Sequence, residues 1–188
     1  MIKLYGSKMT SAFRCHLLLK EMGVPFEEVP IDLSKGEHKS EAFLKLNPNG
    51  KVPCMVEGDF ILWESMAINR YLTHKYQPAL LGNSPEQAAL IDQWSYWAIL
   101  SVQPHLFNLF LSKEAAIIEQ SKAALSPMHQ ILDNHLAGKT YMLGDNFTLA
   151  DINVGSVILV NMLVKNDISA FSNIGQWVQT LFARPSFQ

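Results

Sequence analysis

The strongest constraint on the fold is a change of sequence pattern near Pro85, which divides the 188 residues into two parts of different construction. Residues 1–85 contain six of the nine prolines, six of the ten glycines and 19 charged side chains, whereas the other 103 residues contain 13 charged side chains. Proline and glycine mark turns between short elements, and their scarcity favours long helices. The pattern therefore predicts a mixed α/β part followed by an all-helical part.

In the first part, short strand-like segments alternate with helical ones. The expected elements are strands at residues 2–5 and 26–33, helices at 11–22 and 40–46, a hairpin of residues 54–56 and 60–63, and a helix at 65–76. Gly23 and Pro25 are typical of residues that end a helix, and Ser65 is expected to cap the last one. The predicted order is βαβ, helix, ββ, helix.

In the second part, apolar residues recur at helical spacing, as in residues 128–136, so we expect only helices. Residues 148–151 (TLAD) place a hydroxyl at an N-cap and a carboxylate three residues later, a variant of the capping box. The helix that follows, to about Val164, is apolar on nearly all sides and is expected in the middle of a bundle. The expected domains are residues 1–77 and residues 85–188, with a linker at about residues 78–84.

Composition argues against several classes of protein. Apolar residues make up 48% of the chain and charged residues 17%, with a net charge of −2, so neither a disordered tail nor a nucleic-acid-binding protein is expected. The longest apolar stretch, residues 152–164, is shorter than the ~20 residues of a membrane span, and the N-terminus lacks the pattern of a secretory signal. Cys15 and Cys54 have no metal-ligand spacing, so we expect no metal and a cytoplasmic location.

Three segments of the first part are suited to bind a small anionic peptide. Ser65 begins a helix, whose N-terminus attracts a carboxylate, and Glu64 beside it can accept from an ammonium group. A cis bond between Val52 and Pro53 would leave the Val52 N–H and C=O able to pair with a peptide backbone. The cations available for a second carboxylate are His38, Lys39 and Lys51.

These residues belong to a set of segments that together resemble the glutathione S-transferase family along nearly the whole chain. The segments are KLYG at 3–6, GEHK at 36–39, NPNGKVP at 47–53, ESMAI at 64–68, TLAD at 148–151 and ARPSF at 183–187. Each is weak alone, and their common order and spacing carry the resemblance. The resemblance implies a thioredoxin-like α/β N-terminal domain, an all-α helical-bundle C-terminal domain, glutathione as co-substrate and a homodimer. It points to a serine-type member, similar to the phi or theta class or to a bacterial relative.

The resemblance also implies roles for individual residues. Val52 before Pro53 matches the contact with the cysteinyl backbone of glutathione, and Glu64 with Ser65 matches the contact with the γ-glutamyl end. The positions that reach the glycyl carboxylate in relatives are occupied here by His38, Lys39 and Lys51.

The resemblance places the catalytic group in the loop before the first helix. In serine-type relatives, a hydroxyl four residues before an arginine donates a hydrogen bond to the thiolate of bound glutathione. Counting back from Arg14 gives Thr10, and a one-residue shift gives Ser11, so both remain candidates. Such a bond raises the ionised fraction of the thiol at neutral pH. Cys15 lies inside the expected helix, and Tyr5 lies too early for the tyrosine-type arrangement.

The second part offers apolar residues for the other substrate. Trp97, Phe107 and Phe110 are candidates to border a pocket for a hydrophobic electrophile, with core packing as the alternative. The sequence ends soon after Pro185, so we expect this pocket to be open. Asn49 stands where many relatives have an aromatic residue that clasps the other subunit.

The activity implied by the resemblance is conjugation of the glutathione thiolate to small hydrophobic electrophiles. Glutathione and such an electrophile are then the expected partners, with no nucleic acid and no membrane. Two alternatives remain: a non-catalytic glutathione-transferase-like module for protein assembly, and glutathione-dependent peroxide reduction at the same site.

Overall fold

The structure, a computed structural model, describes residues 1–188 and divides into two compact units, Met1–Pro78 and Ala79–Gln188. The fold class expected from the sequence is confirmed, since a small mixed sheet with helices comes first and helices alone follow. None of the helices combines the length and apolar character that crossing a membrane requires.

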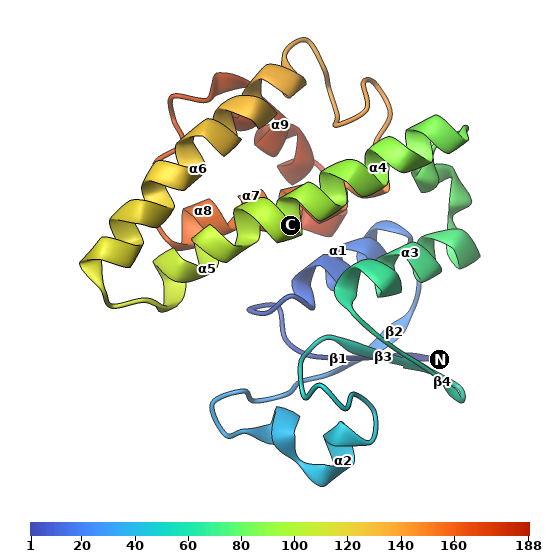
Figure 1. Cartoon of the computed structure of the whole chain (residues 1–188). Coiled ribbons are helices and arrows are strands. Elements are labelled where there is room, and N and C mark those ends of the chain that lie inside the picture. Colours follow the sequence, from blue (N-terminus) through green and yellow to red (C-terminus); the bar gives the residue numbers. More distant parts are fainter. The chain divides into compact units, whose positions relative to one another are not determined.

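The first unit is a four-stranded sheet with three α-helices. Its elements are β1 (Ile2–Tyr5), α1 (Phe13–Glu21), β2 (Phe26–Val29), a 3-10 helix (Glu37–Lys39), α2 (Glu41–Leu44), β3 (Cys54–Glu57), β4 (Phe60–Trp63) and α3 (Ser65–Tyr76). The strand order is β2-β1-β3-β4, with β1 parallel to β2 and the two other pairs antiparallel. Helices α1 and α3 pack together on one face of the sheet, and α2 lies on the opposite side (Figure 1).

The βαβ order of the first three elements follows from the sequence pattern. In β1, Ile2 and Leu4 are buried, whereas Lys3 is exposed and its Nζ lies 3.4 Å from Oε2 of Glu27 in the neighbouring strand. Parallel strands cannot be joined by a tight turn, so α1 forms the crossover from β1 to β2. Gly23, at φ +64°, lets the chain leave α1 in the left-handed conformation.

Helix α1 begins two residues later than expected, at Phe13 instead of Ser11. Residues 10–13 form a turn, closed by the hydrogen bond from the Phe13 N–H to the Thr10 carbonyl (3.0 Å), and the Thr10 hydroxyl accepts from the Ala12 N–H (3.2 Å). A hydroxyl that accepts from the N–H two residues later is typical of a turn that leads into a helix. Both candidate hydroxyls therefore belong to the loop and not to the helix.

Other boundaries also differ from the expectation. The helix expected at residues 40–46 is shorter, since α2 covers Glu41–Leu44 and Ser40 is its N-cap. Strand β2 ends at Val29 rather than Leu33, because Pro30 has no N–H with which to continue the ladder. Ser65 is the first residue of α3 and not its N-cap, since Glu64 occupies that position and forms no side-chain capping bond. The Ser65 hydroxyl is therefore not used within its own helix.

The C-terminal end of α3 is tied to strand β3 through the Glu57 carboxylate. This carboxylate accepts hydrogen bonds from Tyr71 Oη (2.8 Å), Lys75 Nζ (2.6 Å) and Tyr76 Oη (2.5 Å). Partial burial raises the pKa of Glu57, but the hydrogen bonds from these three donors outweigh it and lower the pKa from 4.5 to about 2. Glu57 is thus ionised at neutral pH and holds α3 along the β3–β4 hairpin.

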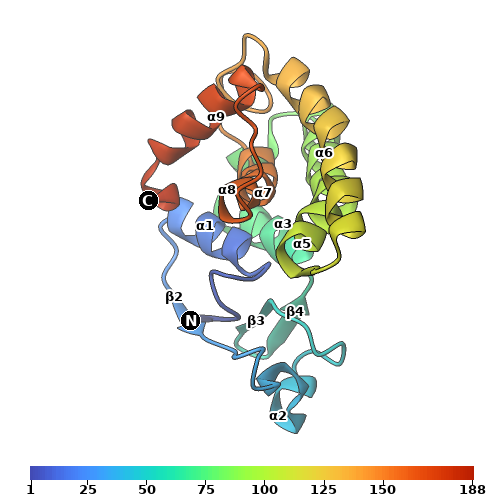
Figure 2. The ribbon, with the colours of Figure 1, turned by 90° about the vertical axis from the view of Figure 1, so that its left-hand side faces the viewer.

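The second unit contains only helices. In chain order they are a 3-10 helix that begins at the unit boundary (Pro78–Leu81), α4 (Pro85–Trp97), a π-helical turn (Ala98–Val102), α5 (Gln103–Leu111), α6 (Ala115–Leu136), α7 (Leu149–Ile158), α8 (Val160–Leu163), α9 (Ser172–Phe182) and a closing 3-10 helix (Pro185–Phe187). Helix α7 lies between α6 and α9 (Figure 2) and packs against α4 and α9. Every residue of α7 is buried, as predicted for a helix that is apolar on nearly all sides.

The helix expected to about Val164 is interrupted after Ile158. The side-chain amide of Asn161 donates to the Ile158 carbonyl (2.9 Å), which a continuing α-helix would use for the Met162 N–H. That N–H donates to the Leu159 carbonyl instead (3.1 Å). A short separate helix, α8, is the result.

The predicted capping box is present at the start of α7. Asp151 Oδ2 accepts from the Thr148 N–H (2.9 Å) and Oγ1 (3.1 Å), and Asp151 Oδ1 accepts from the Met142 N–H (2.8 Å) and Trp177 Nε1 (2.9 Å). Burial raises the pKa of Asp151, and these hydrogen bonds lower it by less. One buried carboxylate thus joins α7, α9 and the loop before α7.

Candidate active site

Three segments leave the sheet at one end because the strands that carry them are paired in register. Tyr5, the last residue of β1, lies opposite Cys54, the first residue of β3. Cys54 in turn lies opposite Trp63, the last residue of β4. Three segments therefore lie together at one end of the strands: the loop after β1, residues 52–53 before β3 and residues 64–65 after β4.

Val52 presents two free backbone groups at this end of the sheet. The Val52–Pro53 peptide bond is cis. Neither the N–H nor the C=O of Val52 has a hydrogen-bond partner within the chain, so both are available to an external backbone. The preceding turn is fixed by Asn47, whose Nδ2 donates to the Lys51 carbonyl (2.6 Å) and whose Oδ1 accepts from the Asn49 N–H (3.0 Å).

The two candidate hydroxyls have different surroundings. Thr10 Oγ1 donates to the Ser7 carbonyl over 2.7 Å. It also lies near Val52, because a Cβ atom placed on Gly6 would be 3.5 Å from Thr10 Oγ1 and 3.2 Å from Val52 Cβ. The Ser11 hydroxyl is half-buried and has no hydrogen-bond partner within the chain. Thr10 Oγ1 and Val52 Cβ therefore lie close together on either side of Gly6.

Glu64 and Ser65 stand at the start of α3 in unusual surroundings. Glu64 has φ +73° and ψ 113°, a strained conformation that costs of order 1–3 kcal/mol in a non-glycine residue and is often found at functional sites. Ser65 is buried, and its Oγ accepts from Arg14 Nη1 over 3.1 Å. Burial lowers the pKa of Arg14 from 12.5 to about 10, which still leaves the guanidinium charged at neutral pH. A positive charge therefore lies beside the N-terminus of α3.

The candidate cations gather around Gly50, which has φ +57°. Lys39 Nζ donates to the Asn49 carbonyl over 3.2 Å. A Cβ atom placed on Gly50 would lie 2.7 Å from Lys39 Nζ and 2.9 Å from the His38 carbonyl oxygen, so only glycine allows this close approach. Lys51 follows directly, and its exposed side chain has no partner within the chain. The structure thus brings these three residues together, with Lys39 already bound to the neighbouring loop.

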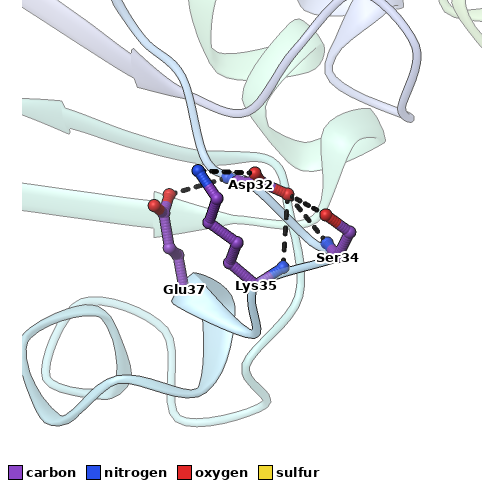
Figure 3. A network of polar contacts seen from close by, with 4 residues as sticks. All are labelled: Asp32, Ser34, Lys35 and Glu37. Carbon is purple, nitrogen blue, oxygen red and sulfur yellow. Dashed lines mark hydrogen bonds and ion pairs between the residues drawn. The ribbon is translucent and has the colours of Figure 1, made fainter.

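The loop that leads to the first two cations is fixed by a network around Asp32 (Figure 3). Asp32 Oδ1 accepts from the Ser34 N–H (2.9 Å) and Oγ (2.6 Å), and Asp32 Oδ2 lies 3.4 Å from Lys35 Nζ. Glu37 Oε2 accepts from the Asp32 N–H (2.7 Å), and the Glu37 N–H donates to the Asp32 carbonyl (3.2 Å). The pKa of Asp32 is lowered, and the hydrogen bond from the Ser34 hydroxyl is the largest cause of this shift.

Neither cysteine is suited to act as a thiolate nucleophile. Cys15 is fully buried in α1, and burial raises its pKa from 9.0 to about 12. Cys54 is also buried, and burial raises its pKa to about 11. Both thiols are therefore protonated at neutral pH and poor nucleophiles. No group of three or more His, Cys, Asp and Glu side chains is arranged to hold a metal ion.

The aromatic candidates for the electrophile pocket lie in the second unit. Trp97, the last residue of α4, is half-buried, and its ring centroid lies 5.2 Å from that of Trp94. Phe107 and Phe110 are neighbours on α5 and are 39% and 54% exposed. These two phenylalanines therefore lie outside the core of this unit.

Two residues that shape the site carry no direct signal of that role in the sequence. In the sequence, Arg14 serves only to locate the candidate hydroxyls in the loop before it. In the structure, its guanidinium contacts Ser65, 51 positions away. Asn47 reads as part of a turn, but it is 2% exposed and both ends of its amide bind the backbone. The one available signal is a polar residue type at a position that the surrounding pattern makes internal.

Known proteins resemble both parts of the chain. Residues 1–74 match the family model of the glutathione S-transferase N-terminal domain, and residues 86–185 match that of the C-terminal domain. The chain is 34% identical over 203 residues to glutathione S-transferase 3 of Zea mays, which covers all of this chain and 91% of that protein. It is 36% identical over 165 residues to glutathione S-transferase F9 of Arabidopsis thaliana, covering 81% of this chain and 77% of that protein.

A solved structure gives the same correspondence in three dimensions. Glutathione S-transferase I from maize, in complex with an atrazine glutathione conjugate, matches with a TM-score of 0.87 at 31% identity, covering 98% of this chain and 93% of that one. A match of this extent includes the sheet and the helices that follow it. Since the family models match both of its parts in the expected order, the chain belongs to the glutathione S-transferase family.

Proposed function

We propose that this protein binds glutathione at the end of the sheet where Val52 and Ser65 lie, and conjugates its thiolate to small hydrophobic electrophiles. The observation that carries the proposal is the free N–H and C=O of Val52 at the same end of the sheet as Thr10 and Ser65. The cysteinyl backbone pairs with Val52, the γ-glutamyl carboxylate binds at Ser65, and Glu64 accepts from the γ-glutamyl ammonium group. The glycyl carboxylate lies toward His38, Lys39 and Lys51.

The names of the relatives support this assignment. The maize and Arabidopsis proteins are both named glutathione S-transferases, and the maize structure holds an atrazine glutathione conjugate. A glutathione conjugate is the product of the proposed reaction.

In the proposed reaction, the glutathione sulfur forms a C–S bond with an electrophilic carbon. With a chloronitroaromatic acceptor, the C–Cl bond breaks and chloride leaves with the bonding electron pair. The thiol proton passes to solvent before the attack, because the thiolate is the nucleophile. Stabilising that thiolate is therefore the main task of the protein.

Thr10 is the hydroxyl that we assign to the sulfur. It accepts the Ala12 N–H, which polarises the hydroxyl and leaves its one hydrogen to donate. This hydrogen bonds the Ser7 carbonyl in the free protein and turns to the thiolate when glutathione binds beside Val52. The N-terminus of α1 favours the same negative charge.

Thr10→Ala is expected to lower turnover near neutral pH about 10- to 100-fold, because a hydrogen bond to a charged group contributes ~1.5–3 kcal/mol. It is also expected to raise the pKa of the bound glutathione thiol by about one to two units. Turnover with a chloronitroaromatic acceptor and the ultraviolet absorbance of the thiolate against pH measure these two effects.

Ser11→Ala is the matched control for Thr10→Ala, and it is expected to change turnover by less than about twofold. A loss of turnover in Ser11→Ala alone would transfer the role to Ser11. If neither variant loses turnover, neither of these two hydroxyls activates the thiol.

The second substrate and the domain boundaries complete the proposal. We assign the electrophile to the helical domain, where Trp97, Phe107 and Phe110 supply apolar surface. The proposed domains are residues 1–77 and 85–188, joined by residues 78–84. We place the protein in the cytoplasm, where its two unpaired thiols stay reduced.

We further propose that the chain forms a homodimer through β4. This strand lies at the edge of the sheet and exposes Phe60, Ile61 and Trp63 by 44%, 39% and 39%. An apolar edge strand left open is a site of association. Asn49 adds no clasp, because its Nδ2 donates to Asn47 Oδ1 on its own turn (3.1 Å).

Sedimentation equilibrium is expected to give twice the chain mass of 21.1 kDa. Ile61→Lys is expected to shift the protein toward the monomer, because it places a charge in the apolar face of β4. Leu33→Lys changes a similarly exposed side chain (43%) outside β4 and is expected to leave the dimer intact. A monomeric wild-type protein would contradict this proposal.

A further inference from the structure

A buried arginine links the two helices that begin at the candidate site. Arg14, in the first turn of α1, is only 5% exposed, and its Nη1 donates to Ser65 Oγ over 3.1 Å. Two more contacts fix this junction: Asn69 Nδ2 donates to the Arg14 carbonyl (3.3 Å), and Cys15 Sγ lies 3.7 Å from the Ser65 carbonyl oxygen. The packing of α1 on α3 therefore holds the guanidinium beside the Ser65 hydroxyl.

The chemistry of the two groups fixes the direction of their hydrogen bond. A guanidinium only donates, whereas a hydroxyl has one hydrogen and two lone pairs. Ser65 must therefore accept from Arg14, and its own hydrogen remains for another partner. No capping bond in α3 uses that hydrogen, and no acceptor within the chain receives it.

A carboxylate is the partner that suits this arrangement. The first-turn N–H groups of α3 and the charge of Arg14 both attract an anion, and burial strengthens that attraction. We propose that Arg14 is a positioning residue: it sets the Ser65 hydroxyl to donate to the γ-glutamyl carboxylate of glutathione. This inference rests on the proposed function and adds a residue that acts through Ser65.

A change of protein and ligand together separates this role from general support of the fold. Arg14→Met keeps most of the side-chain volume and removes both the charge and the donor. The two ligands are glutathione and γ-aminobutyryl-cysteinyl-glycine, which lacks only the γ-glutamyl carboxylate. Calorimetry gives the Kd of each ligand for wild type and variant, and circular dichroism establishes that the variant is folded.

We expect Arg14→Met to weaken glutathione binding about tenfold or more and to weaken binding of the analogue less than about twofold. Ser65→Ala is expected to give the same pattern, and the double variant no further loss, since both residues act on one hydrogen-bonded unit. Equal weakening of both ligands by Arg14→Met, or unchanged glutathione binding, would overturn the role of Arg14.

Arg14→Lys serves as the second variant where Arg14→Met does not fold. It keeps the charge on a shorter donor, so we expect a smaller loss that is still confined to glutathione; an equal loss for both ligands again overturns the inference. A wild-type protein that does not bind glutathione contradicts the proposed function itself. If the wild type binds glutathione and Arg14→Met weakens the binding of both ligands equally, only the role of Arg14 is contradicted.

Discussion

Gly6→Ala is expected to lower the free energy of unfolding by about 3 kcal/mol or more and to prevent glutathione binding. Gly6 has φ +132°, a conformation that residues with a Cβ rarely adopt. The new Cβ would lie 2.7 Å from Ala12 Cβ and 3.2 Å from Val52 Cβ. Both of these atoms are bonded directly to the backbone, so relief of the clash requires the loop with Thr10 and the turn with Val52 to move apart.

Denaturant unfolding measures the loss of stability in Gly6→Ala, and calorimetric titration measures glutathione binding. Gly23→Ala is the matched control, because Gly23 also has a positive φ (+64°) but a Cβ atom placed on it would have no neighbouring atom within 4 Å. It is expected to lose about 1 kcal/mol and to bind glutathione as the wild type does. Equal losses in the two variants would show that backbone conformation alone, and not the close contact, constrains Gly6.

Asp151→Ala is expected to destabilise the second unit by about 3–5 kcal/mol. It leaves the buried donors of Thr148, Met142 and Trp177 without their acceptor, and each such group costs ~1–3 kcal/mol. Thermal or urea unfolding followed by circular dichroism measures the loss. Asp145→Ala, at an exposed residue of the preceding loop, is expected to change stability by less than about 0.5 kcal/mol. A loss below about 1 kcal/mol in Asp151→Ala would contradict the structural role assigned to this carboxylate.

The same carboxyl group gives a pH dependence of defined sign. Burial raises the pKa of Asp151 above 3.8, so the folded protein holds this proton more tightly than the unfolded chain does. The stability that protonation contributes is therefore fully present below pH 3.8 and is lost as the pH rises through the folded pKa. The stability difference between the wild type and Asp151→Asn, which does not titrate, is expected to narrow as the pH is raised above 3.8.

Much of the fold could be predicted from local signals. Strands β1 and β4 and helix α3 have the bounds expected from the sequence, because apolar spacing and flanking turn residues mark them directly. Boundaries that depend on a side chain competing for the backbone could not be predicted. Asn161 interrupts the helix after Ile158. Its side-chain amide takes the Ile158 carbonyl that a continuing helix would have used, and the apolar pattern does not record that choice.

The candidate site could be predicted by segment but not by its internal contacts. Residues 52–53 and 64–65 follow from the hairpin, whose register brings its two outer ends together. The contact of Arg14 with Ser65 depends on how α1 packs on α3, which neither segment determines alone. The placement of Thr10 depends likewise on a turn whose hydrogen bonds the sequence does not specify.

The backbone of Glu64 sets heat resistance and ligand recognition against each other at one position. A φ of +73° suits glycine, so a sequence selected for thermal stability alone would favour glycine there. That change would relieve the backbone and, in the same step, remove the carboxylate proposed to accept the γ-glutamyl ammonium group. Under the proposed role of Glu64, a variant engineered for higher temperature through glycine at this position is therefore expected to bind glutathione more weakly.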